Sequence, residues 1–374
     1  MSRKSRRDRE DTKVINRKAL LATLTLIALL SWSRSATAQH YQQSNLVSDV
    51  PGLAALTDSN LVNPWGVVAA SPAGPWWVNA NGTGVSELFD GAGHPFPPGN
   101  QLVVNIPTPS GEGTSAPTGI VFNGGTGFEV TTGNPARFIF VTEDGTISGW
   151  NPAVDLHNAV IKVNNTATAV YKAVTLGQRN GADFLYATNF SAGTIEVYDT
   201  GFQPVTLPGA AFTDPNLPSG FVPFSIQNIA GSIFVSFAKK EAGSEDEVHG
   251  AGLGYVDAFT SDGTLIFRLK HGRWMNAPWG MTLAPANFGK FSNHLLIGMF
   301  GSGQVAAFNP KTGNFSGLLR GPIGHPITID GLWALVFGNG GVAGPTNTLF
   351  FSAGINDEAD GLFGTLTAIK GAGK

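Results

Sequence analysis

Carboxylate side chains that could bind a metal ion gather in three short segments of the sequence. These segments are Glu143 with Asp144, Glu241 with Glu245, Asp246 and Glu247, and Asp357 with Glu358 and Asp360. Ca²⁺ is a hard cation that prefers about six to eight clustered oxygen ligands. We therefore predict a divalent cation site, with Ca²⁺ as the candidate ion, formed by Glu143, Asp144, Asp357, Glu358 and Asp360. The alternative is that these carboxylates belong to solvated hairpin turns.

A second set of polar and aromatic residues could orient a ligand. Trp274 could stack on a sugar or another ring, and its basic and amide neighbours could supply hydrogen bonds. The ligand-binding candidates are Asn63, Lys270, Arg273, Trp274, Asn276 and Asp330. The alternative for the segment around Trp274 is an ordinary loop that pairs with neighbouring acids. The chain has no cysteine, which excludes thiol nucleophiles and thiolate metal sites. No H-E-x-x-H or G-x-S-x-G motif occurs, so we assign no catalytic residue.

A short phrase with a small residue at a constant place recurs six times, at intervals of about 54 residues. The small residues are Gly66, Gly119, Ala173, Ser225, Gly280 and Ala334. Each phrase is followed by a run of β-branched and aromatic residues, a turn and another such run, which is the pattern of strand, turn and strand. The period predicts an all-β, six-bladed β-propeller with about four antiparallel strands in each blade. A β-sandwich has no reason to repeat at this interval, and the coils of a β-helix are much shorter.

This architecture would bring the candidate residues to one face. In a propeller, the loops between the second and third strands share a face with the loops that lead into the inner strands. The acidic turns fall in blades 2, 4 and 6, whereas blades 1, 3 and 5 carry turns rich in Asn, Gly and Ser. Asn63, Asn276 and Asp330 precede inner strands and should lie on the same face. We also expect an N-terminal strand, residues 44–50, to close the ring by pairing with residues 366–369.

The first 38 residues have the pattern of a secretory signal peptide. A basic segment precedes an apolar stretch at residues 19–30, and Ala36 and Ala38 fit a signal cleavage site. An uncleaved membrane anchor is the alternative, although the apolar stretch is short for a span. We therefore divide the chain into a signal peptide, residues 1–38, and one propeller domain, residues 39–374, exported to the periplasm or the cell exterior. We expect this domain to be a monomer without a membrane span.

Removing residues 1–38 leaves 14 Lys and Arg residues against 23 Asp and Glu residues, a net charge of −9. Nucleic-acid binding requires basic residues along the phosphates, and anionic membranes attract basic surfaces. The acidic balance therefore argues against both partners.

Several phrases of the sequence resemble a known group of proteins. They include Asn-Leu-Val-Asn-Pro-Trp-Gly ending at Gly66, Asp-Gly-Leu-Trp-Ala-Leu ending at Leu335, and Ala-Asp-Gly-Leu-Phe-Gly ending at Gly364. Together they resemble an uncharacterised family of exported bacterial proteins that is related to the NHL-repeat and TolB-like six-bladed propellers. The resemblance implies the fold and export, and it carries no catalytic residue.

Two functions fit these observations. The first is an exported binding or scaffold module that recognises a protein, a peptide or a glycan. The alternative is a metal-dependent hydrolase of the lactonase type, so enzyme activity is left open. Such an enzyme needs carboxylate or amide ligands that point into the channel. Beside the small residues, the repeated phrases instead carry Trp65, Thr118, Lys172, Phe224, Trp279 and Trp333. This composition favours binding.

Overall fold

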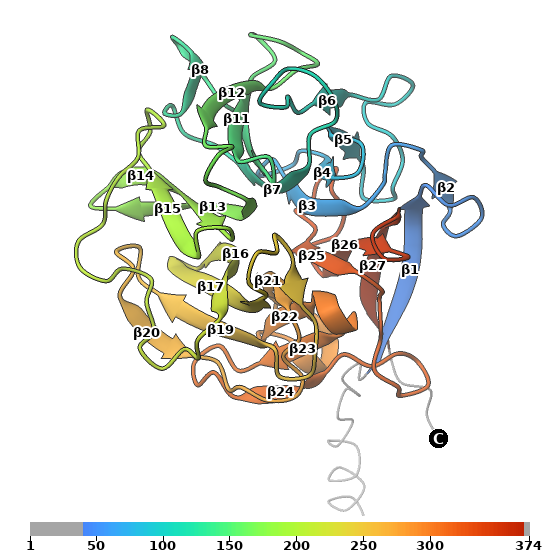
Figure 1. Ribbon diagram of the computed structural model, residues 1–374. Helices are drawn as coiled ribbons and strands as arrows, with labels where there is room; N and C mark the ends of the chain where they lie inside the picture. Colours follow the sequence, from blue (N-terminus) through green and yellow to red (C-terminus); the bar gives the residue numbers. More distant parts are fainter. Residues whose placement is uncertain (1–39, 370–374) are drawn as a thin grey trace, which may run out of the picture. The chain divides into compact units, whose positions relative to one another are not determined.

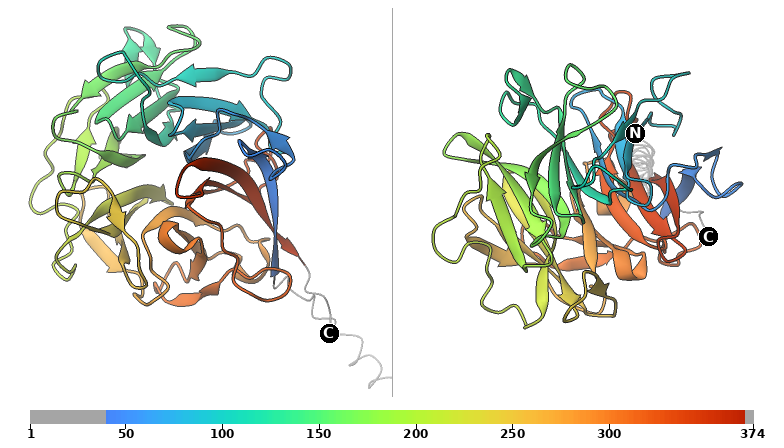
Figure 2. Two further views of the ribbon diagram at one scale, coloured as in Figure 1. Left: turned by 45° about the vertical axis from the view of Figure 1, so that its right-hand side comes forward. Right: turned by 45° about the horizontal axis from the view of Figure 1, so that its top comes forward.

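The computed structural model describes residues 40–369, so the predicted signal peptide and its cleavage site lie outside the described residues. Six small antiparallel sheets are arranged around a common axis, as expected for a six-bladed β-propeller (Figures 1 and 2). Within residues 40–369 the helical elements are two 3-10 turns, η1 (Gly289–Phe291) and η2 (Phe300–Ser302). No helix in this part of the chain is long and apolar enough to cross a membrane.

The first three blades follow one another along the sequence, each starting with its innermost strand. Blade 1 comprises β3 (Pro64–Ala69), β4 (Trp76–Ala80), β5 (Val85–Phe89) and β6 (Val103–Asn105). Blade 2 comprises β7 (Pro117–Phe122), β10 (Phe138–Thr142), β11 (Thr146–Trp150) and β12 (Val160–Asn164), with an inserted hairpin of β8 (Glu129–Thr131) and β9 (Asn134–Pro135). Blade 3 has three strands, β13 (Tyr171–Arg179), β14 (Ala182–Asn189) and β15 (Thr194–Tyr198).

The remaining blades each have at least four strands. Blade 4 comprises β16 (Phe221–Ile229), β17 (Ser232–Lys240), β19 (Gly254–Phe259) and β20 (Leu265–Arg268), with β18 (Glu247–Val248) paired to β17. Blade 5 comprises β21 (Pro278–Leu283), β22 (Leu295–Met299), β23 (Val305–Phe308) and β24 (Phe315–Leu318). Blade 6 comprises β25 (Leu332–Phe337), β26 (Thr348–Ile355), β27 (Asp360–Ile369), β1 (His40–Ser48) and β2 (Leu56–Thr57).

The small residues of the repeated phrase lie where the six inner strands crowd together. A Cβ atom added to Gly66 would lie 2.4 Å from the carbonyl oxygen of Thr118 in the next blade. At Gly280 it would lie 2.5 Å from the carbonyl oxygen of Trp333. Both distances are far shorter than a normal van der Waals contact, so these positions require a residue without a side chain. The spacing of small residues therefore reports the steric demand of the propeller axis.

An N-terminal strand closes the ring, as predicted. β1 pairs with β27 in an antiparallel register that runs from His40 opposite Ile369 to Ser48 opposite Leu362. The predicted bounds, residues 44–50 paired with residues 366–369, differ from the structure. Residues 366–369 pair with residues 40–43, and β1 ends at Ser48. There the Ser48 hydroxyl accepts a hydrogen bond from the Val50 N–H and turns the chain out of the sheet.

Candidate functional site

Aromatic side chains from the inner strands fill the axis of the propeller. Trp65, Trp279 and Trp333 precede the small residues of blades 1, 5 and 6, and each is at most 6% exposed. The rings of Trp65 and Trp333 stack with centroids 3.5 Å apart, and Trp279 meets both of them edge-on. The Trp279 indole N–H also donates a hydrogen bond to the carbonyl oxygen of Lys172 in blade 3. These contacts form a packed floor below the loops of one face.

Lys172 lies at the edge of this floor, at the start of the inner strand of blade 3. Its side chain is 1% exposed, and Nζ lies 2.5 Å from Oε1 of Glu143 and 3.5 Å from Oδ1 of Asp246. Nζ also lies 5.3 Å from the ring centroid of Trp65. Burial lowers the pKa of Lys172, but the carboxylates of Glu143 and Glu247 raise it more, so the pKa ends above its ordinary value. Lys172 is therefore a buried ammonium ion at neutral pH.

The acidic turns of blades 2, 4 and 6 converge around this ammonium ion. Glu143 lies between β10 and β11, Glu247 begins β18, and Glu358 lies between β26 and β27. Nζ of Lys172 contacts Glu143 of blade 2 and Asp246 of blade 4. The turn of blade 6 joins them through Asn63, which donates to Glu358 and lies 3.5 Å from Asn81, the residue that donates to Glu143. The loops that sequence analysis assigned to one face therefore do meet there.

Amide side chains connect the carboxylates to the aromatic floor. Asn81 donates a hydrogen bond of 3.0 Å to Oε2 of Glu143, and Asn63 donates one of 2.7 Å to Oε2 of Glu358. The Trp333 indole N–H donates in turn to Oδ1 of Asn63 at 3.0 Å. Asn63, the residue before β3, thus holds the Glu358 carboxylate in place.

Glu358 is held in an unusual environment. Burial raises its pKa, and the charges of Glu247 and Glu143 raise it further against the hydrogen bond from Asn63, so the pKa reaches about 7. The loop that carries it has φ values of 56° at Asn356, 52° at Asp357 and 65° at Glu358, all in the left-handed region. Such backbone strain in residues other than glycine is costly and is often found at functional sites.

Other polar groups form hydrogen bonds that hold the loop carrying Glu358. Asp330 accepts a hydrogen bond of 2.9 Å from the backbone N–H of Asn356, and the Asn356 side chain donates one of 2.7 Å to Asp360. His249 lies 3.2 Å from Oε1 of Glu247, whose hydrogen bond raises the pKa of the imidazole. Asp330 and Asp360 therefore position the loop that presents Glu358.

An acidic pocket of about 460 Å³ adjoins this network. It is lined by Ala116, Glu143, Asp144, Thr166, Ala169, Val170, Glu245 and Asp246. Asp144 accepts a hydrogen bond of 2.8 Å from the Ala116 N–H, while Asp246 is largely exposed, with 83% of its side chain accessible. The pocket therefore has several carboxylates and no basic side chain in its lining.

The five predicted metal ligands are distributed over separate contacts. Glu143 pairs with Lys172, Asp144 caps a backbone N–H, Glu358 binds Asn63, Asp360 binds Asn356, and Asp357 is exposed. Within residues 40–369 no group of three or more His, Asp or Glu side chains has the geometry to hold a metal ion. The cation among the acidic turns is the Lys172 ammonium. The Ca²⁺ assignment stays a prediction.

The basic and aromatic segment that precedes blade 5 lies apart from this network. The Trp274 ring stacks on Phe315 of β24, the outermost strand of the blade, with centroids 3.9 Å apart and planes 6° apart. Lys270 and Arg273 are exposed, whereas Asn276 is buried and accepts a hydrogen bond of 2.6 Å from the Gly250 N–H. Asn276 thereby contacts the loop between β18 and β19 of blade 4.

Sequence analysis did not identify Lys172 or Glu247 as site residues. A signal for Lys172 was present, because it is the charged residue among the six that stand beside the small positions. Glu247 was recognised as part of an acidic turn, but nothing in the sequence distinguished it from Glu245. The side chain of Glu247 is only 4% exposed, whereas Glu245 is exposed.

Comparison with known proteins places this architecture in a family. No family model matches the chain. Uncharacterized protein L690 of Acanthamoeba polyphaga mimivirus is 31% identical over 337 residues, which cover 86% of this chain and 84% of that protein. Uncharacterized protein R648 of the same virus is 30% identical over 333 residues, covering 86% and 78%. A solved α-L-arabinanase from Penicillium chrysogenum, complexed with arabinobiose, has a TM-score of 0.53 at 10% identity, covering 87% of this chain and 98% of that chain.

The arabinanase likeness shows the fold alone, because its sequence identity is low. L690 and R648 are viral proteins, whereas the resemblance in the sequence pointed to exported bacterial proteins. Bacterial origin and export therefore stay predictions. The chain belongs to the family of propeller proteins that includes the mimivirus proteins L690 and R648.

Proposed function

We propose that this protein is a binding module and that the acidic face around Lys172 takes a positively charged ligand, such as a basic segment of a peptide. The observation that carries this proposal is the pairing of one ammonium ion with acidic turns of blades 2 and 4, next to a third acidic turn that Asn63 holds through Glu358. Lys172 pairs with Glu143, and His249 pairs with Glu247. Asp246 shares Lys172 with Glu143, whereas Asp144 and Glu358 have no salt-bridge partner among the described residues, so the carboxylates outnumber the basic groups and a negative potential extends over the pocket.

The pocket has a size and lining that suit such a ligand. Its volume of about 460 Å³ is in the usual range for small-ligand sites. Glu143, Asp144, Glu245 and Asp246 contribute four carboxylates to its wall. A cationic group would gain charge-assisted hydrogen bonds there, whereas an anionic ligand would be repelled. The aromatic floor beneath the loops makes the site rigid, which lowers the entropic cost of binding.

Calorimetric titration with an acetylated and amidated trilysine peptide would test the proposal. The double variant Glu245→Gln, Asp246→Asn removes two charges from the pocket. It should weaken binding about fivefold, as expected for two exposed charge pairs of about 0.5 kcal/mol each. The matched control Glu129→Gln, Asp262→Asn removes two exposed charges, one on the β8 hairpin and one in the turn between β19 and β20, and should bind like the parent protein. Equal weakening in both variants, or equal binding of a triglutamate peptide, would contradict the proposal.

A hydrolase of the lactonase type is the second candidate, and Glu358 is the observation that favours it. A carboxyl group with a pKa of about 7 could act as a general base or acid at neutral pH. Hydrolysis of a panel of lactones and esters should then depend on Glu358 and be lost in Glu358→Gln. The panel would be assayed with added Ca²⁺ and with chelator, which also tests the predicted metal. No turnover under either condition would leave the binding module as the function.

We also propose that binding takes place outside the cytoplasm, on the basis of the signal-peptide pattern of residues 1–38. Intact-mass measurement of the secreted or periplasmic protein should give a chain that begins at Gln39. Recovery of the full-length chain in the membrane fraction would contradict this proposal.

A further inference from the structure

Within residues 40–369, blade 3 lacks the outer strand that every other blade has. In blade 1, β6 pairs with β5 through Val85 opposite Asn105, Ser86 opposite Val104 and Glu87 opposite Val103. The corresponding residues of β15 are Thr194, Ile195 and Glu196, which pair with β14 on one side. Among the described residues, no strand pairs with their other side. The outer edge of β15 is therefore open over these three residues.

Residues 199–205, which follow β15, cover the C-terminal end of that strand, and the chain then moves away from it. The Val205 N–H donates a hydrogen bond of 2.7 Å to the carbonyl oxygen of Val197, just as the Phe96 N–H donates to Leu88 in blade 1. In blade 1 the chain then returns as β6. In blade 3 it continues toward blade 4, where the Phe212 N–H bonds the carbonyl oxygen of Gly263. The place that β6 occupies in blade 1 thus has no equivalent strand in blade 3.

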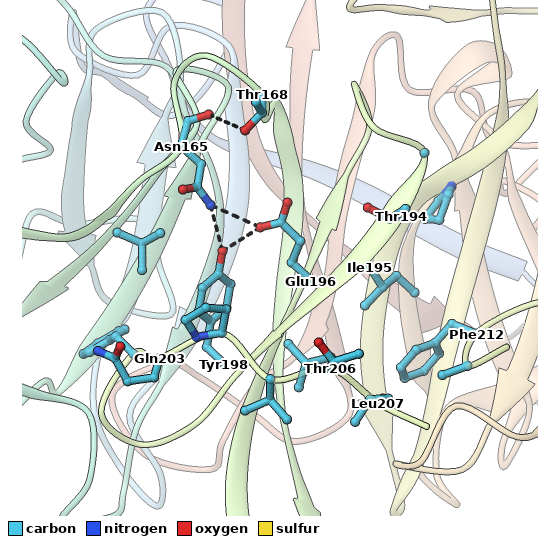
Figure 3. A pocket seen from close by; sticks show the side chains of 18 of the residues that line it. Asn165, Thr168, Thr194, Ile195, Glu196, Tyr198, Gln203, Thr206, Leu207 and Phe212 are labelled. Atoms are coloured by element: carbon cyan, nitrogen blue, oxygen red, sulfur yellow. Dashed lines mark hydrogen bonds between the residues drawn. The ribbon is translucent and has the colours of Figure 1, made fainter. Parts of the chain in front are cut away.

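A cavity of about 750 Å³ lies at this edge (Figure 3). All five residues of β15 line it, together with residues 202–207 and 211–213 and parts of blade 2. A strand rises about 3.3 Å per residue, so β15 is about 17 Å long and could pair with a segment of similar length. The cavity therefore follows the length of an open strand edge.

The two walls of the cavity differ in polarity, as Figure 3 shows. On the side of blade 2, the Glu196 carboxylate accepts hydrogen bonds of 2.5 Å from the hydroxyl groups of both Tyr171 and Tyr198. Asn165 donates to the Tyr198 oxygen at 3.0 Å and also lies on this side. On the other side, Ile195 and Leu207 pack against the apolar core that continues into blade 4. One face of β15 thus carries the Glu196 carboxylate toward a polar wall, where Lys162 is tied to the carbonyl oxygen of Val130, and the other face is apolar.

We propose that the edge of β15 binds an extended peptide segment of a partner protein as the missing fourth strand of blade 3, antiparallel to β15. Successive side chains of a strand point to opposite faces. The bound segment should therefore alternate, with basic residues facing Glu196 and apolar residues facing the wall of Ile195 and Leu207. Main-chain hydrogen bonds would supply affinity, and the two walls would supply specificity. This site is separate from the axial face.

The geometry also predicts which backbone amides of the peptide form hydrogen bonds with β15. The carbonyl oxygen of Val197 points outward, because it accepts from Val205. Backbone groups of a strand alternate in direction, so the N–H and C=O of Ile195 should point outward too. The residue opposite Ile195 must then supply the hydrogen bonds, and its side chain faces the apolar wall. In an alternating Val-Lys peptide, the valine amides should bond β15 and the lysine amides should not.

The experiment uses an acetylated and amidated hexapeptide of alternating Val and Lys residues as the probe in calorimetric titration. Two further peptides carry backbone N-methyl groups, one on the valine amides and the other on the lysine amides, so they share composition and charge. We expect the parent peptide and the lysine-methylated peptide to bind more tightly than the valine-methylated peptide, which keeps only the contribution of the acidic axial face. Absence of binding by the parent peptide at millimolar concentration, or equal behaviour of the two methylated peptides, would overturn the proposal. Binding only at the acidic axial face would give the two methylated peptides equal affinity, because they carry the same charge.

A protein variant tests the polar wall. Glu196→Gln keeps an acceptor for the two tyrosine hydroxyl groups but removes the charge. It should weaken the Val-Lys hexapeptide about two- to fivefold, the size of a cross-strand charge pair, and should leave a Val-Thr hexapeptide unchanged. Glu129→Gln, an exposed position on β8, is the matched control and should have no effect. A loss of the same size for both hexapeptides in Glu196→Gln would overturn the charge assignment.

Discussion

Replacing Lys172 with Met removes a buried cation from the axial face while keeping a long side chain. In the parent protein Nζ lies 2.5 Å from a Glu143 oxygen, and the Lys172 side chain is 1% exposed. Removing one partner of a buried ion pair costs about 3–5 kcal/mol, because the other charge remains without compensation. Glu143 is 24% exposed and can recover some hydration, so we expect the lower end, about 3 kcal/mol at pH 7.

This loss can be measured by urea unfolding and by the melting temperature. An unfolding entropy of about 2.1 cal/mol/K per residue converts 3 kcal/mol into a decrease of roughly 4 °C in a domain of this size. The fold raises the pKa of Lys172 above its ordinary value of 10.5, so its stabilisation is fully present below pH 10.5. In the variant, protonation of the remaining carboxylates relieves their repulsion. The deficit should therefore be smaller at pH 5 than at pH 8.

A double-mutant cycle with Glu143→Gln isolates the pair from the packing change. The double variant should be more stable than the sum of the two single effects predicts, with a coupling of about 1–3 kcal/mol. The reasoning would be refuted if Lys172→Met changed stability by less than about 0.5 kcal/mol, the size of an ordinary surface substitution, at both pH values.

Three further predictions concern the acidic loop, the axis and the closure of the ring. Because the fold raises the pKa of Glu358 from 4.5 to about 7, it favours the neutral carboxyl and parent stability should fall as pH rises through this range. Glu358→Gln should thus melt higher than the parent at pH 8 and equally at pH 5, and equal melting at both would contradict this. Gly66→Ala should lose about 1–3 kcal/mol in urea unfolding through overpacking, whereas the matched control Gly124→Ala, which meets only Phe122 at 3.4 Å, should not. Deleting residues 40–48 leaves the edge of β27 unpaired and should cause aggregation in size-exclusion chromatography. A monomeric product with an unchanged melt would mean that β1 does not close the ring.

The fold could be predicted because the steric demand at the axis is local. Each inner strand must present a small residue where neighbouring backbones approach, so Gly66 and its equivalents carry a signal that repeats with the blade. The shared face of the acidic turns followed from the same reasoning. The number of strands in blade 3 could not be predicted, since residues 199–220 contain apolar residues like those of other outer strands and differ only in where the chain leads.

The interior of the site was beyond sequence reasoning because it depends on contacts between distant segments. Lys172 meets Glu143 and Asp246, which come from two other blades. Trp274 lies among basic residues, which made it a candidate for stacking on a ligand, with an ordinary loop as the alternative. Its ring instead packs on Phe315, which follows in the outer strand of the same blade. An aromatic residue in a loop carries no sign of whether another ring will cover it.

Blade 3 joins the two proposed sites through neighbouring residues of one strand. At the start of β13, the hydroxyl group of Tyr171 donates to Glu196 in the peptide site, whereas Nζ of Lys172 binds Glu143 on the axial face. Burial and the hydrogen bond to Glu196 raise the pKa of Tyr171, so its hydroxyl group stays a donor. Tyr171→Phe should cost about 1.5–3 kcal/mol, because the hydroxyl group donates to a carboxylate and also contacts Asn165 and Tyr198.

The two side chains share no hydrogen-bond partner, although they are adjacent in sequence. The effects of Tyr171→Phe and Lys172→Met on urea unfolding should therefore add to within about 0.5 kcal/mol, as independent sites do. Tyr171→Phe should also leave trilysine binding at the axial face unchanged, because the Lys172–Glu143 pair remains intact. A non-additive energy above about 1 kcal/mol would show that the bulge between Tyr171 and Ala173 transmits strain from one site to the other. The axial face and the peptide edge would then be one coupled site.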